Sequence, residues 1–309
     1  MTVTLSVVVP IYRSEQTIRE LCQRVASVFE AKGLRGEILL VNDGSPDNSW
    51  NLIQQLAAQN KSIRGINLAR NFGQHPAILA GLNAARGSWV VVMDADLQDT
   101  PEAIGDLLDA AVSGGWDAVI ARRVGHANGA MDAFTSRLFY RVLRNFAGVE
   151  TGTDEGNFGI YSARLINSVK NVGDQDFFFP TLVRWAGFKT TTLAVPRLER
   201  EQGVSAYTFG RRLSLALRVL VINSNKLLQL SITVGLVASS LAMIYAIYLI
   251  IANSMGVIKV EGWTSVMVAI FFIGGAILVS NGVLGLYLGR VFDSTKNRPR
   301  YIVADELNS

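Results

Sequence analysis

The chain has 309 residues, of which half are hydrophobic and only 17% are charged, and its mean hydropathy is +0.28. This composition is too apolar for an ordinary soluble enzyme, and the single cysteine, Cys22, excludes an internal disulfide framework and fits a reducing compartment. The net charge of +4 is compatible with nucleic acid, but the basic residues cluster beside the apolar segments. That placement favours anionic lipid head groups and phosphates, and no nucleic acid.

The first part of the chain alternates short apolar runs with helical patterns. We expect strands at 5–9, 37–42, 63–68, 89–93 and 117–121, and helices at about 14–32, 49–59, 76–85 and 101–112. This alternation predicts a mostly parallel, doubly wound α/β sheet, in which ligands bind at the carboxyl ends of the strands. Two of these strand ends carry acids, one at Asp43 and the other at Asp94 and Asp96.

The segment Trp89–Glu102 (WVVVMDADLQDTPE) places three aspartates, Asp94, Asp96 and Asp99, within six positions after a predicted buried strand. Asp94 and Asp96 can point to the same side of the chain, and Gln98 continues that line. Two carboxylates and an amide oxygen suit a hard divalent cation such as Mg²⁺ or Mn²⁺, which also bridges substrate phosphates. The alternative is that these acids are helix caps and solvated turn residues.

Asp43, at the end of the second strand, is suited to accept a hydrogen bond from a nucleobase N–H or a ribose hydroxyl. No P-loop and no G-x-G-x-x-G motif follows any of the predicted strands. The sequence therefore argues against a nucleoside triphosphate or dinucleotide site.

Four sequence blocks resemble the family 2 glycosyltransferases, which use nucleotide-diphospho-sugars and have the GT-A fold. They are VVVPIY with Glu15, VNDGSPDNS, NLARNFGQHPAILAGLNAARG and VVMDADLQDTPE. The last two blocks, together with two long apolar segments, resemble the polyisoprenyl-phosphate glycosyltransferase branch, relatives of dolichol-phosphate mannose synthase. The resemblance covers nearly the whole chain, and it strengthens the metal interpretation of the acid cluster.

The resemblance implies a role for several residues at the strand ends. The implied nucleotide-sugar pocket comprises Pro10, Tyr12, Glu15, Asp43, Arg70, Asp94 and Ala95. Asp94 and Asp96 would form the D-x-D motif, and Asp94, Asp96 and Gln98 would hold Mg²⁺ or Mn²⁺ on the diphosphate. For Arg70, a surface ion pair is an equal alternative.

The block Thr153–Arg164 matches a family segment in which many members carry an aspartate as the proposed base, and here Asn157 stands at that position. A neutral amide cannot accept a proton. A lipid phosphate monoester, however, has a second pKa of about 6 and is largely dianionic at neutral pH. The asparagine therefore favours a phosphate acceptor over a sugar hydroxyl, which would need a general base. Asp154 and Glu155 are nearby alternatives for that role.

The segment Arg197–Tyr207 resembles the family's R-x-x-G-x-S-K-Y block, with Ala206 in place of the usual lysine. Four residues are expected to bind the acceptor and the phosphates: Arg200, Ser205, Tyr207 and Arg211. Arg200 would also neutralise the leaving diphosphate. The predicted catalytic residues are Asp96, Asp154, Asn157 and Arg200.

Two uncharged segments, 227–252 and 263–289, each exceed the roughly 20 residues needed to cross a bilayer. They predict a transmembrane hairpin. Basic residues flank the hairpin, whereas its turn holds only Lys259, so the positive-inside rule places both termini in the cytoplasm. Small residues at helical spacing, such as Gly285 and Gly289, would let helices pack closely within the hairpin or between subunits of a homo-oligomer.

Two basic amphipathic segments accompany the hairpin. The segment 209–226 predicts an interfacial helix, and 131–146 predicts a helix that either lies on an anionic membrane or packs on the sheet with a basic solvent face.

The expected organisation follows the chain. It is a cytoplasmic GT-A domain at 1–208, an interfacial helix at 209–226, a transmembrane hairpin at 227–289 and a cytoplasmic tail at 290–309. The expected activity is inverting, metal-dependent transfer of a sugar from a nucleotide-diphosphate sugar to a polyisoprenyl phosphate at the inner or plasma membrane. The alternatives are a transferase acting on a glycan or glycolipid hydroxyl and a catalytically silent, nucleotide-sugar-binding membrane scaffold.

Overall fold

The computed structural model describes residues 4–124, 155–172, 178–196, 262–296 and 298–308, with scattered residues between 233 and 255. The chain divides into two compact units. The first unit comprises residues 1–133, 151–206 and 298–309, and the second comprises residues 134–150 and 207–297.

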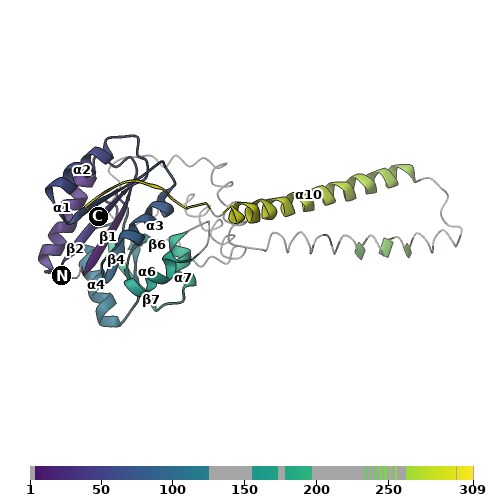
Figure 1. Cartoon of the computed structure of the whole chain (residues 1–309). Helices are drawn as coiled ribbons and strands as arrows, with labels where there is room; N and C mark the ends of the chain where they lie inside the picture. Colours follow the sequence, from purple (N-terminus) through teal and green to yellow (C-terminus); the bar gives the residue numbers. More distant parts are fainter. Residues whose placement is uncertain are drawn as a thin grey trace. The chain divides into compact units, whose positions relative to one another are not determined.

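The first unit is an α/β domain (Figure 1). Its described strands are β1 (Leu5–Ile11), β2 (Gly36–Asn42), β3 (Ile63–Leu68), β4 (Trp89–Val92), β5 (Ala118–Val124), β6 (Glu155–Ser162), β7 (Thr190–Pro196) and β8 (Val303–Leu307). Its described helices are α1 (Ile18–Ala31), α2 (Ser49–Gln59), α3 (Gln74–Ala84), α4 (Ala103–Gly114), α6 (Ala163–Lys170) and α7 (Phe179–Trp185).

The strands form one sheet in the order β7-β5-β6-β4-β1-β2-β3-β8. β1 pairs in parallel with β2 and with β4, and β2 pairs in parallel with β3. β6 runs antiparallel between β4 and β5, and β8 runs antiparallel along the edge beside β3. The chain therefore changes direction across the sheet at β1 and β4, the switch point beside which doubly wound sheets bind ligands.

Helices cover both faces of the sheet (Figure 1). Val7 and Val9 of β1 pack with residues of α1, α2 and α4, whereas Val8 packs with residues of α3, α6 and α7. All three valines are fully buried. Burial on both faces explains why the strands read as continuous apolar runs rather than as alternating ones.

Every strand and helix predicted up to residue 121 is present, with its ends shifted by a few residues. α3 begins at Gln74 rather than Pro76 because Gly73, at φ +104°, takes the N-cap position. Pro76 then lies in the first turn, where a missing N–H costs no helical hydrogen bond.

The residues predicted as a cytoplasmic tail, 290–309, contain secondary structure that the sequence patterns did not indicate. α10 (Trp263–Thr295) continues past Gly289, and Val303–Leu307 forms β8. The pairing with β3 runs from Gly65 opposite Leu307 to Leu68 opposite Val303. β8 is a short, half-exposed edge strand with acidic residues, so it carries little of the apolar signal by which buried strands are recognised.

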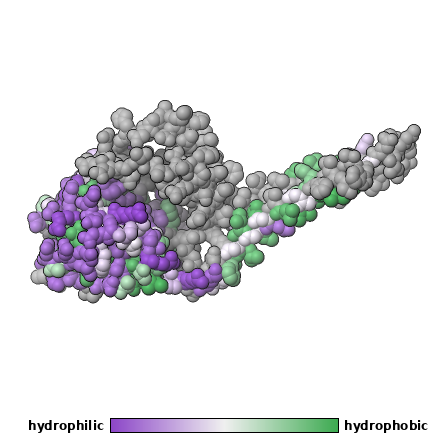
Figure 2. Space-filling model, turned by 90° about the horizontal axis from the view of Figure 1, so that it is seen from above, coloured by the Kyte–Doolittle hydropathy of each residue, from purple (hydrophilic) through white to green (hydrophobic). Residues whose placement is uncertain are grey.

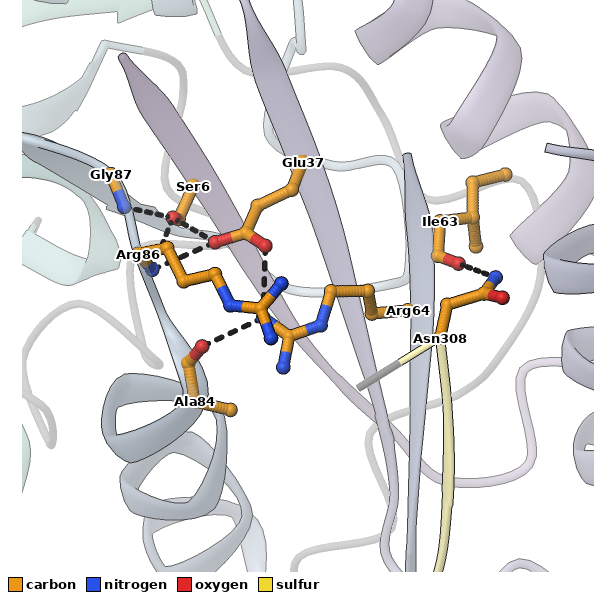
Figure 3. Close-up of polar contacts among 8 residues, drawn as sticks. All are labelled: Ser6, Glu37, Ile63, Arg64, Ala84, Arg86, Gly87 and Asn308. Atoms are coloured by element: carbon orange, nitrogen blue, oxygen red, sulfur yellow. Dashed lines mark hydrogen bonds and ion pairs between the residues drawn. The ribbon is translucent and has the colours of Figure 1, made fainter. Parts of the chain in front are cut away.

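The amino edge of the sheet holds a buried ion pair (Figure 3). The Glu37 carboxylate accepts hydrogen bonds from Arg64 Nη1 at 2.9 Å, from the Ser6 hydroxyl at 2.6 Å and from the Arg86 N–H at 2.8 Å. Arg64 also donates to the Ala84 carbonyl at 2.8 Å. Each charge is thus removed from water together with several partners, as a buried ion pair requires.

The second unit contains α10, whose 33 residues extend about 50 Å. None of the described side chains in its stretch Phe272–Gly289 is buried, and among the residues described this stretch belongs to the one helix that is long and apolar enough to cross a membrane. The surface of this long helix is largely hydrophobic in Figure 2. The other predicted span, 227–252, lies mostly outside the described residues, and 131–146 and 209–226 lie wholly outside them.

Candidate functional site

A pocket of about 360 Å³ lies where β1, β2, β3 and β4 end. It is lined by Pro10, Ile11, Tyr12, Ser14, Asp43, Asn71, Gly73, Gln74, Asp94, Ala95 and Asp96. The acids predicted at two separate strand ends therefore share one cavity at the switch point of the sheet, because parallel strands bring their carboxyl ends to the same edge.

Asp43 directly follows β2 and is 3% exposed. One of its carboxylate oxygens accepts a hydrogen bond from the Phe72 N–H at 2.7 Å, and the other accepts one from the Gly73 N–H at 2.9 Å. Burial raises the pKa of Asp43, while these hydrogen bonds and the Arg70 guanidinium oppose the rise. Asp43 thus fixes the loop after β3 against the end of β2.

The glycine after Asp43 allows the two loops to touch. Gly44 has φ +59°, and a Cβ at this position would lie 2.5 Å from the backbone of Arg70 and Asn71. Any side chain here would be strained in its own backbone and would push the loop after β3 away from the pocket.

The segment after β4 is held from two sides. Gln74 Nε2 donates to an Asp94 carboxylate oxygen at 2.6 Å, and the Thr17 hydroxyl donates to the Ala95 carbonyl at 2.6 Å. Asp96 is exposed and accepts a hydrogen bond from the Gln98 N–H at 3.1 Å. Leu97 has φ +57°, a strained value for a non-glycine residue, and such strain is common in ligand-binding loops.

A divalent cation fits the donor set of the pocket. Asp94 and Asp96 offer hard oxygen ligands there. Among the residues described, no cluster of three or more His, Cys, Asp or Glu side chains could enclose a metal ion by itself. Mg²⁺ is commonly held by one or two carboxylates that leave positions for phosphate oxygens and water. Gln98, predicted as a further ligand, is 6% exposed and lies outside the lining of the pocket.

The loop after β1 supplies Tyr12, whose side chain is 44% exposed at the pocket. The Arg13 N–H donates to the Ser45 hydroxyl at 2.7 Å, so this loop is tied to the loop after β2. Glu15 adds a second hydrogen bond between these two loops, because its carboxylate accepts the Asn48 N–H at 3.2 Å. Glu15 therefore supports the pocket loops from outside the lining.

Arg70 also lies outside the lining. Its guanidinium carbon lies 4.4 Å from the centre of the Phe72 ring, a cation–π arrangement. Its charge still acts on the site, because it lowers the pKa of Asp43 against the effect of burial.

Sequence reasoning missed five lining residues, which are Ile11, Ser14, Asn71, Gly73 and Gln74. Asn71 and Gly73 belong to the loop after β3 and Gln74 begins α3, and the N-F-G-Q stretch that they share is the signal that marks this strand end. Of the remaining predicted residues, Asp154, Arg200, Ser205, Tyr207 and Arg211 lie outside the described part of the chain.

Asn157 lies in β6, and its side chain is half-buried. β6 is antiparallel to β4, and their pairing ends with Gly159 opposite Val92. The first residues of β6 therefore lie near the edge of the sheet at which β4 ends. Continuing this register by two residues would bring Asn157 opposite Asp94.

Comparison with known proteins gives related enzymes over the whole chain. An uncharacterized glycosyltransferase of Synechocystis sp. is 34% identical over 306 residues, which cover 99% of this chain and 96% of that protein. A bactoprenol glucosyl transferase of Shigella phage SfV is 31% identical over 303 residues, covering 98% of each. An undecaprenyl-phosphate 4-deoxy-4-formamido-L-arabinose transferase of Shewanella sediminis is 31% identical over 306 residues, covering 98% and 92%.

Among solved structures, one similar fold is glucosyl-3-phosphoglycerate synthase from Mycobacterium tuberculosis, in complex with Mn²⁺, UDP and phosphoglyceric acid. Its identity is 18% and its TM-score is 0.51, over 71% of this chain and 76% of that one, so the likeness concerns the fold. The family described as glycosyl transferase family 2 matches residues 6–169. With its GT-A-like sheet and these relatives, the chain belongs to glycosyltransferase family 2, alongside enzymes named for sugar transfer to polyprenyl phosphates.

Proposed function

We propose that this protein is a membrane-anchored, inverting glycosyltransferase that moves a sugar from a nucleotide-diphosphate sugar to a polyisoprenyl phosphate. The observation that carries the proposal is the single pocket that unites Asp43 with Asp94 and Asp96 at the switch point of the sheet. The names of the bactoprenol and undecaprenyl-phosphate transferases among its relatives support the class of acceptor.

The pocket has two chemically different ends. Pro10, Tyr12 and Asp43 would face the nucleoside, because an aromatic ring can stack on a base and a carboxylate can accept hydrogen bonds from it. Asp94 and Asp96 would face the diphosphate, where they would hold Mg²⁺ or Mn²⁺. When bound, this cation would neutralise charge that develops on the leaving diphosphate.

The reaction needs no proton transfer from the acceptor. An oxygen of the lipid phosphate forms a bond to the anomeric carbon, and the bond between that carbon and the diphosphate oxygen breaks with its electron pair staying on the diphosphate. The products are a polyisoprenyl phosphate that carries the sugar and a nucleoside diphosphate. A phosphate monoester is largely dianionic at neutral pH, so Asn157 in the place of a base is compatible with this step.

The sheet itself constrains the membrane topology. β1 to β7 precede residue 197, whereas β8 follows residue 297, and all of them belong to one sheet. A single sheet lies on one side of a bilayer, so in the proposed arrangement the segment between them would cross the membrane an even number of times. α10 is long enough for one crossing, and the uncharged stretch 227–252 would supply the second.

The charge distribution supports a cytoplasmic catalytic domain on a two-span membrane hairpin. Arg211, Arg212, Arg218 and Lys226 precede the hairpin, and Arg290 and Lys296 follow its second uncharged stretch, whereas Lys259 is the one basic residue in the turn. Association into a homo-oligomer through the membrane helices stays a prediction.

A transfer assay tests the proposal. Membranes containing the protein are incubated with labelled nucleotide sugars, undecaprenyl phosphate and Mg²⁺ or Mn²⁺, and the product is extracted into organic solvent. Transfer is expected from at least one sugar nucleotide, to require the cation, and to fall about 100-fold or more in Asp96→Ala. Asp106→Ala, which removes an exposed acid of α4 outside the pocket, is the matched control and should retain activity. Label found only on glycan would contradict the proposed acceptor.

A further inference from the structure

A ladder of polar side chains crosses three strands at the pocket end of the sheet. Asn42 is the last residue of β2, Asn67 lies opposite it in β3, and Asp305 lies opposite Asn67 in β8. Asn42 Nδ2 donates to Asn67 Oδ1 at 2.8 Å, and Asn67 Nδ2 donates to an Asp305 carboxylate oxygen at 3.0 Å. The ladder thus runs from a buried amide to an exposed carboxylate.

This ladder has a direction, and Asp305 sets it. A carboxylate only accepts hydrogen bonds, so it orients the Asn67 amide with its NH₂ group outward and its oxygen toward Asn42. The Asn42 amide is then oriented with its own oxygen toward the loop after β2, where it accepts the Ser45 N–H at 3.4 Å. The Asp305 carboxylate of β8 therefore orients the Asn67 amide in the neighbouring strand and the Asn42 amide in the strand beyond it.

The ladder ends on loops that line the pocket. Asn42 precedes Asp43, and Ser45 accepts the Arg13 N–H of the loop after β1 at 2.7 Å. The backbone just before β8 also holds the loop after β3. The Ala69 N–H, next to Arg70, donates to the Ile302 carbonyl at 2.9 Å. Residues that follow α10 in the chain thus support the loops after β1, β2 and β3.

We propose that Asn42, Asn67 and Asp305 are positioning residues for the nucleotide pocket, so that the C-terminal strand takes part in donor binding although it touches no donor. This inference rests on the proposed function, because it concerns the same pocket. It predicts that loss of the Asp305 carboxylate loosens the loop that carries Asp43 and weakens nucleotide binding, whereas binding of the lipid acceptor is unchanged.

The opposite end of β8 offers a matched control. Asn308 donates to the Ala57 carbonyl at 2.7 Å and to the Ile63 carbonyl at 2.8 Å, at the amino edge of the sheet and away from the pocket. Asn308→Ala therefore removes hydrogen bonds from the same C-terminal segment to α2 and to the start of β3, without touching the ladder.

The test compares full-length Asp305→Ala, Asp305→Asn and Asn308→Ala with the wild type. The KM for the sugar nucleotide is expected to rise about threefold to tenfold in Asp305→Ala, with the KM for undecaprenyl phosphate unchanged. Asp305→Asn, whose amide oxygen can still accept from Asn67, should stay within about twofold of the wild type. Asn308→Ala should lower the melting temperature and leave both KM values unchanged.

Hydrogen–deuterium exchange provides a readout that needs no substrate. In Asp305→Ala, amide exchange is expected to accelerate in the segments 43–48 and 69–74, and to stay at the wild-type rate there in Asn308→Ala. Unchanged exchange in Asp305→Ala, or an equal KM rise in both alanine variants, would overturn the inference. A wild-type protein without transferase activity would instead contradict the proposed function and leave the exchange experiment valid.

Discussion

Asp43 shows how one carboxylate can serve both the fold and the site. Its two oxygens hold the Phe72 and Gly73 N–H groups, so the loop after β3 closes one side of the pocket. Because burial raises its pKa, the ionised form costs stability, and protonation favours the folded state as the pH falls. The same protonation would remove an acceptor from the proposed nucleotide site, so we expect stability and nucleotide binding to respond to pH in opposite directions.

The first prediction follows from this raised pKa. The affinity for UDP or GDP, whichever the wild type binds more tightly, should fall on acidification from pH 7.5, beginning at a higher pH than the ordinary Asp value of 3.8 would give. Asp43→Asn should bind about tenfold more weakly at neutral pH, because an amide cannot accept from both N–H groups, and should lack this pH step. Calorimetric titration measures both. The same acid step in Asp43→Asn would show that another group is responsible.

At the scale of elements, the carboxyl ends of the strands form the pocket, and their amino ends contribute to stability. The carboxyl edge carries the pocket, and the amino edge carries the buried pair of Glu37 and Arg64, whose side chains are 6% and 8% exposed. Opposite edges of a sheet are separated by the length of the strands. We therefore expect substitutions at the amino edge to change stability and to leave nucleotide binding intact.

The second prediction tests this separation. Glu37→Gln should lower the free energy of unfolding by about 3–5 kcal/mol, because it leaves the Arg64 charge buried without a counter-ion. Nucleotide affinity should be unchanged. Asp109→Asn, which breaks an exposed ion pair with Lys32, is the control and should change the urea midpoint little. A shift in Glu37→Gln no larger than that of the control would contradict a structural role for the buried pair.

Local sequence patterns predicted the strands that are buried on both faces of the sheet. They did not predict strands whose place depends on pairing with strands distant in the sequence. β1 to β4 were found because their apolar runs are continuous, and the acids at their ends followed from the topology. β6 and β8 were missed because glycines interrupt the first and acids the second, and their places in the sheet depend on strands distant in sequence. Gln74 was missed for a similar reason: only the folded loop brings its amide to Asp94.

The resemblance to a family placed more residues in the site than the fold brings there. Pro10, Tyr12 and Ala95 line the pocket, whereas Glu15 and Arg70 lie outside its lining and act on its loops. A motif records which residues accompany a function, and it does not separate those that touch a ligand from those that hold the loops in place.

On the scale of the whole molecule, the return of the chain to β8 makes the topology testable. The third prediction is that Met255→Cys, in the turn between the proposed spans, reacts with a membrane-impermeant thiol reagent in intact cells. Glu306→Cys on β8 should react only after permeabilisation. Cys22 gives little background, because burial raises the pKa of its thiol to about 12. Labelling of both engineered cysteines from the same side would contradict the two-span arrangement.

The proposed function depends most on a phosphate as the attacking group, because Asn157 stands where many members of the family carry the aspartate proposed as the base for a hydroxyl acceptor. The most direct test offers the purified protein, in lipid nanodiscs with its sugar nucleotide, either undecaprenyl phosphate or undecaprenol of the same chain length. We predict transfer to undecaprenyl phosphate and none to undecaprenol, with one nucleoside diphosphate released for each undecaprenyl-phosphate sugar formed. Comparable transfer to undecaprenol would contradict the account.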